Sequence, residues 1–168
     1  MQPTRRFALA AVAAAAAGPA TAQQRIGLAE RRGLAAYQEQ VLPGLVQQIN
    51  EAAGYDLPLE IDWNAIALAV VGHGERYTEP EFFTDIYFRP LIEALRAITR
   101  DAMGREALKS ALKRVVFTYN AETAPVSNYP TGVSFADGTL RINFRPWANA
   151  ADVTPRARAI QQLLERNL

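Results

Sequence analysis

The dipeptide Asp137-Gly138 restricts the fold of this chain more than any other feature, because short alternating apolar stretches flank it on both sides. An Asp-Gly pair in this setting is typical of a two-residue hairpin, in which both central residues take a positive φ. If residues 136 and 139 face each other, the apolar side chains of both strands share one face, and Ser134 pairs with Arg141 on the other. A slip of one residue would turn the apolar side chains to the wrong face, so the pattern predicts the register as well as the hairpin.

Two further stretches, 115–119 and 57–63, alternate with the period of two that is typical of a half-buried strand. Pro58 cannot donate a hydrogen bond to a neighbouring strand, so the stretch around it is expected at a sheet edge or to begin at Pro58. We therefore predict an α+β fold with helices packed on one face of a small antiparallel sheet. The sheet is expected to be a three-stranded meander of 115–119, 132–136 and 139–144, with 57–63 as a fourth strand at an edge.

Helical spacing of apolar residues accounts for much of the remaining chain. Residues 28–53 show it with an interruption at Pro43-Gly44, where we expect a kink or two shorter helices. Thr78 and Glu81 have the spacing of a capping box, which predicts the start of a helix that Pro90 then kinks or splits. Shorter helical patterns follow at 105–112 and from Thr154-Pro155 onward.

The N-terminal segment has the composition of an export signal. Arg5 and Arg6 precede an apolar run over 7–17, and the small residues Ala20-Thr21-Ala22 follow. These are the three regions of a secretory signal peptide, and the run is too short to cross a bilayer. We predict a cleaved signal peptide at 1–22, a single globular domain at 23–168, and a periplasmic or secreted protein of bacterial origin.

The segment from Thr4 to Leu9 also resembles a twin-arginine export signal, with Ala8 where the strict pattern has a large apolar residue. The resemblance covers this signal alone and implies export of a folded protein. Of 18 Lys+Arg, two lie in the signal, whereas all 17 Asp+Glu lie beyond it, so residues 23–168 are almost neutral. A domain with almost no net charge has no overall positive charge to favour binding to nucleic acid or to an anionic membrane surface. Without cysteine, the domain has neither disulfides nor thiolate metal ligands.

His73, the single histidine, lies between two glycines and close to Glu75. A histidine beside a carboxylate can act as a general base or contribute to a metal site. Transition-metal sites normally need several nitrogen or sulfur ligands, and the chain has no nucleotide-binding glycine loop, so we expect neither a metal nor a cofactor. None of the three serines lies in a G-x-S-x-G motif. Paired carboxylates stay a further option, with candidates Glu60, Asp62, Glu75, Glu79 and Glu81.

Polar residues on the last predicted strand suggest a binding face instead. Arg141 and Arg145 flank Asn143, and these three side chains can bind an anionic or sugar-like ligand. Thr118 and Asn120 are expected to share this exposed face.

The connection 121–131 is long for a meander, whose hairpin loops usually have two to five residues. Long loops often carry function, and this one contains Glu122, Asn128 and Tyr129. We expect Tyr129→Ala to weaken partner binding while leaving stability nearly unchanged.

Two functions therefore remain open. The favoured one is an exported binding or interaction module without catalytic activity, whose partner is an envelope protein or a small polar ligand. Nucleic-acid binding is not expected, and neither is a membrane span once the signal is cleaved. The alternative is a small periplasmic hydrolase that acts on envelope polymers through His73 and Glu75 or through a carboxylate pair. A concave pocket that gathers polar groups around His73 would favour the hydrolase.

Overall fold

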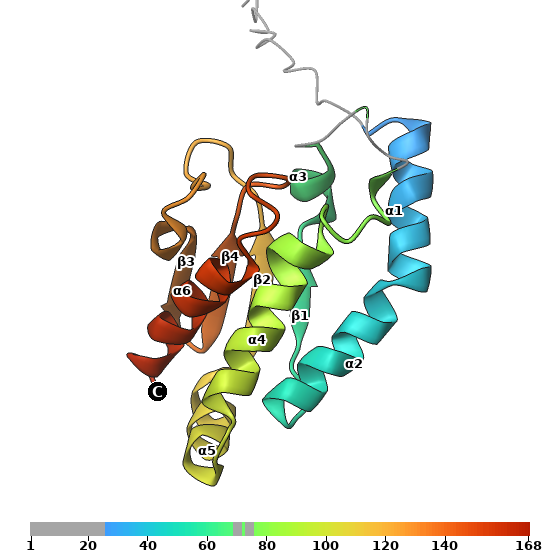
Figure 1. Cartoon of the computed structure of the whole chain (residues 1–168). Helices are drawn as coiled ribbons and strands as arrows, with labels where there is room; N and C mark the ends of the chain where they lie inside the picture. The colour runs from blue at the N-terminus through green and yellow to red at the C-terminus, as the bar shows by residue number, and fades with distance from the viewer. Residues whose placement is uncertain (1–25, 69–71, 73–75) are drawn as a thin grey trace, which may run out of the picture.

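The computed structural model describes residues 26–68, 72 and 76–168 (Figure 1). The predicted signal at 1–22 lies outside these residues, and so do His73 and Glu75, the candidates of the alternative hydrolase. The α-helices of the described part are α1 (Leu28–Gln40), α2 (Leu42–Ala53), α3 (Trp63–Leu68), α4 (Arg89–Ile98), α5 (Ala102–Ala111) and α6 (Val153–Glu165). The strands are β1 (Leu59–Ile61), β2 (Arg114–Thr118), β3 (Val133–Ala136) and β4 (Thr139–Asn143). A π-helical turn, η2 (Thr84–Phe88), precedes α4, and a short 3₁₀ helix, η3 (Tyr129–Gly132), precedes β3.

The four strands form one mixed sheet in the order β1-β2-β4-β3. The pairs β1–β2 and β2–β4 are parallel, and only β3–β4 is antiparallel. The α+β class and the edge position of β1 are confirmed, whereas the three-stranded antiparallel meander is wrong. The burial of the two hairpin strands agrees with this order, because the core-facing side chains of β4 are the more deeply buried. Leu140 and Ile142 are fully buried in the centre of the sheet, whereas β3, with its half-buried Phe135, takes the edge.

The β3–β4 hairpin has the predicted register. Val133 faces Ile142, Ser134 faces Arg141, Phe135 faces Leu140 and Ala136 faces Thr139. Asp137 and Gly138 take φ values of 50° and 72°, so both turn residues are in the left-handed region. The hairpin prediction is therefore confirmed in its turn as well as in its pairing.

Two helix boundaries show where local signals succeed and fail. The helical stretch 28–53 divides at Val41, and Pro43 lies in the first turn of α2, where a proline is tolerated. In contrast, no helix begins at the capping box of Thr78, and residues 78–83 form turns instead. The rings of Phe82 and Phe83 are buried against each other, with centroids 4.6 Å apart, and this packing outweighs the local capping signal.

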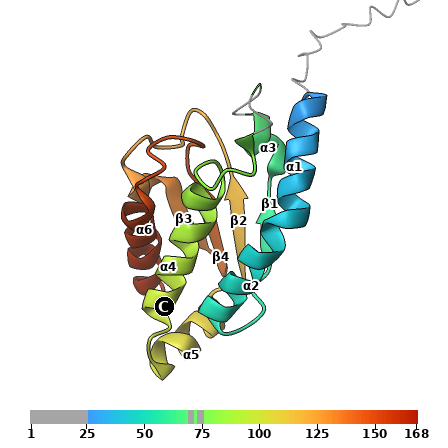
Figure 2. The same ribbon diagram turned by 45° about the vertical axis from the view of Figure 1, so that its right-hand side comes forward.

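Helices cover one face of the sheet and leave the other open. Figures 1 and 2 show α2, α4 and α6 side by side on the covered face, and the buried core lies between them and the sheet. Val115 and Phe117 of β2 point into this core, as do Leu140 and Ile142 of β4. Among the helices of the described residues, none is long and apolar enough to cross a membrane.

Candidate binding face

The uncovered side of the sheet carries a set of polar side chains that we call the open face. Strand alternation places them there, because residues next to each core residue point the opposite way. The open face comprises Glu60, Arg114, Thr118, Ser134, Thr139, Arg141 and Asn143. The register lines up Glu60, Val116, Arg141 and Ser134 in one row across all four strands.

Arg141 lies near the middle of the open face, and its guanidinium is free. The side chain is exposed, and no hydrogen bond or ion pair joins it to any residue that the structure describes. Its neighbour Arg114 is engaged, because it pairs with Glu60 at 2.9 Å and donates to the Thr139 hydroxyl at 2.9 Å. The open face therefore offers one uncompensated positive charge with five N–H donors for a ligand.

Two shallow hollows meet at Arg141. One, of about 370 Å³, lies toward the carboxyl ends of β2 and β4, and polar groups of Thr118, Asn143 and Ser134 line part of it. The other, of about 280 Å³, lies toward the hairpin turn. Both hollows include Arg141 and Ser134, so one guanidinium and one hydroxyl are accessible from either side. The larger hollow is within the size range of small-molecule sites, although the face is open rather than enclosed.

Side chains at the end of β4 hold the long connection in place above this hollow. The Asn143 amide accepts a hydrogen bond from the backbone N–H of Asn120 at 2.9 Å and donates to Thr123 at 3.0 Å. Arg145 donates to the carbonyl oxygen of Ala121 at 3.3 Å. Two of the predicted binding residues, Asn143 and Arg145, thus anchor the loop, whereas the side chain of Arg141 is unengaged within the described residues.

The sheet topology also gives the loop a structural reason to be long. β3 is not the neighbour of β2, since β4 lies between them. The chain must therefore pass over the end of β4 before it returns as β3, which a tight turn cannot achieve. Glu122 and Asn128 are exposed on this connection, as expected for contact residues.

Tyr129 does not present its ring to a partner, contrary to expectation. It is only 3% exposed, and its ring lies edge-on to Phe144 with centroids 5.7 Å apart. Its hydroxyl donates to the Asp152 carboxylate at 2.7 Å, and the guanidinium of Arg156 lies 4.6 Å from the ring centroid. Burial raises the pKa of the Tyr129 phenol, and the hydrogen bond to Asp152 adds to this effect. The ring and the hydroxyl of Tyr129 therefore make their contacts within the fold.

Arg156 is the central residue of this cluster, and the sequence analysis missed it. The side chain is fully buried and donates to the backbone carbonyls of Asn149 and Ala148. Desolvation lowers the pKa of this guanidinium, while the nearby Tyr129 and Asp152 act in the opposite direction. A signal was present, because Arg156 precedes Ile160 and Leu164 at intervals of four and so lies on the apolar stripe of α6.

Of the candidates for a carboxylate pair that the structure describes, three are engaged with other groups. Glu60 is paired with Arg114, and Glu79 with Arg76 at 2.7 Å. Asp62 accepts a hydrogen bond from the backbone N–H of Ala65 at the start of α3. Among the residues described, no group of three or more His, Asp or Glu side chains is arranged to hold a metal ion.

No protein-family model, curated protein or solved structure matches this chain.

Proposed function

We propose that this protein is a small exported binding module whose open face takes a polar ligand with a negatively charged group. The observation that carries the proposal is the exposed guanidinium of Arg141, which has no partner within the described residues and is shared by two hollows. Hydroxyl and amide groups beside it can bind the uncharged part of such a ligand. The N-terminal residues 1–22 support a periplasmic or secreted location.

A charged sugar and its neutral counterpart test this proposal. We expect glucuronate to shift the backbone NMR signals of β3 and β4, and we expect glucose at the same concentration to shift them far less. Arg141→Gln should weaken the response to glucuronate by roughly tenfold or more, because a hydrogen bond to a charged group contributes about 1.5–3 kcal/mol.

Arg32→Gln serves as the matched control, since Arg32 is an exposed arginine of α1 in the helical layer. It should leave the response unchanged. Equal responses to the two sugars, or a response that survives Arg141→Gln, would contradict the proposal. The alternative hydrolase would act through His73 and Glu75, which lie outside the described residues, or through a carboxylate pair, and it stays a prediction.

A further inference from the structure

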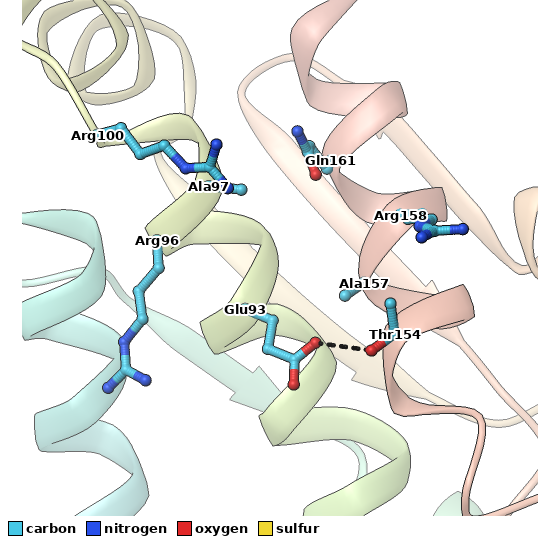
Figure 3. Close-up of a pocket in the computed structure, with 8 residues that line it drawn as sticks. All are labelled: Glu93, Arg96, Ala97, Arg100, Thr154, Ala157, Arg158 and Gln161. Carbon is cyan, nitrogen blue, oxygen red and sulfur yellow. Dashed lines mark hydrogen bonds between the residues drawn. The ribbon is translucent and has the colours of Figure 1, made fainter.

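A groove on the outer side of the helical layer carries a second concentration of positive charge. It lies between α4 and α6 and encloses about 330 Å³ (Figure 3). We call it the arginine groove, because Arg96, Arg100 and Arg158 line it. The open face lies on the other side of the sheet, so the two regions are separated by the core.

The three arginines of the groove lack counter-charges. All are exposed, and none forms a hydrogen bond or an ion pair with a residue that the structure describes. The one carboxylate lining the groove is Glu93, which accepts a hydrogen bond from Thr154 at 3.4 Å. Figure 3 shows this pair at one end of the groove and Arg100 at the other. The end near Arg100 therefore has no carboxylate among its lining residues.

Some arginines outside the groove form ion pairs, unlike the three that line it. Arg89 pairs with Asp85 at 3.0 Å, and Arg114 pairs with Glu60 at 2.9 Å. Arg96 lies in the last turns of α4, and Arg100 follows in the turn after Ile98, so both are at the same end of this helix.

Small side chains leave space between the two helices for a ligand. Ala97 of α4 and Ala157 of α6 lie along the groove, where longer side chains would fill it. Gln161 lies opposite Arg100, and its amide N–H donates to the Glu165 carboxylate at 2.7 Å. The groove thus combines room for a small molecule with cationic walls.

We propose that the arginine groove binds a small soluble ligand with two or more phosphoryl groups. The planar guanidinium of arginine matches the oxygens of a phosphoryl group and donates two parallel hydrogen bonds to it. Figure 3 shows Arg100 reaching toward α6, whereas Arg96 extends away from it, so the positive charges around the groove are spread apart. A diphosphate carries several charges on a short backbone and can reach more than one guanidinium, which a monovalent anion cannot. This proposal is independent of the proposed function, because it uses another face and other residues.

Inorganic diphosphate is the probe, and orthophosphate at equal ionic strength is its comparison. We expect diphosphate to shift the backbone NMR signals of α4 and α6 and to bind more tightly than orthophosphate. Arg100→Gln and Arg158→Gln should each weaken diphosphate binding by roughly tenfold, the fold-change for losing a hydrogen bond to a charged group. Arg32→Gln, on α1, should leave it unchanged.

Four results would overturn the proposal. The first is diphosphate binding no tighter than orthophosphate, and the second is binding that persists in both groove variants. The third is binding to phosphatidylglycerol vesicles without binding to diphosphate, which would assign the groove to a membrane surface rather than to a small ligand. Shifts confined to β3 and β4, and lost in Arg141→Gln, would also refute it while supporting the open face as the anion site.

Discussion

Replacing Tyr129 by alanine should destabilise this protein strongly. The ring is 3% exposed and lies between Phe144 and the guanidinium of Arg156. Removing a buried aromatic ring typically costs about 3–5 kcal/mol, since the apolar contacts are lost and a cavity remains. The loss also removes the nearer of the two aromatic rings beside the buried Arg156, the other being Phe144, so we expect the upper half of this range.

Urea unfolding measures this effect. With a slope near 2 kcal/mol/M, a loss of about 4 kcal/mol lowers the midpoint by about 2 M. Tyr129→Phe is the matched control, because it keeps the ring and removes only the hydroxyl that donates to Asp152. It should cost only about 1 kcal/mol.

An alanine variant as stable as the parent protein would refute the reasoning, and it would restore Tyr129 as an exposed contact residue. A phenylalanine variant as unstable as the alanine variant would show that the hydroxyl, and not the ring, carries the stabilisation.

Three further predictions concern the turn, a buried carboxylate and the N-terminus. Gly138→Val should cost about 1–3 kcal/mol, because valine is strained at a φ of 72° and its Cβ would lie 2.7 Å from Lys113 Cγ; an unchanged denaturation midpoint would contradict this. Burial raises the pKa of the Asp85 carboxyl above 3.8, so the folded protein binds the carboxyl proton more tightly than the unfolded chain does. The stability that this proton binding contributes is present at low pH and is lost as pH rises through the folded pKa. Asp85→Asn should remove that part of the pH dependence, and identical melting profiles of both proteins from about pH 4 to 7 would exclude the effect. Exported protein should begin at Gln23, and an intact mass that includes residues 1–22 would disprove cleavage there.

The elements that could be predicted from the sequence are those fixed by neighbouring residues. The hairpin depends on a turn of two residues and on alternation over a few more, so its register follows from local geometry. The same alternation says which face a side chain takes, but not which strand lies beside it. Alternation alone therefore does not predict that β2 pairs with β4 in parallel.

The candidate site likewise has features that could be predicted from the sequence and features that could not. The exposure of Arg141 follows from its place on the polar side of β4. The burial of Tyr129 depends on Arg156 and Asp152, which belong to the C-terminal part of the chain and approach only in the folded protein. Their contacts cannot be derived from residues 121–131 alone, where a tyrosine in a polar loop is typical of an exposed contact.

The position of β2, parallel to both of its neighbours, has a consequence for the order of folding. The hairpin joins strands separated by a two-residue turn, and its closure costs little chain entropy. Pairing β1 with β2 closes a loop that contains α3, α4 and α5, so this contact requires much of the helical layer to be gathered first. We expect amide protons of β4 that bond to β3 to gain protection early in pulsed hydrogen exchange, and those that join β1 to β2 to gain it last. If both sets of amide protons gained protection at the same time, the sheet would form as one cooperative unit, and the hairpin would not form ahead of the other strand pairs.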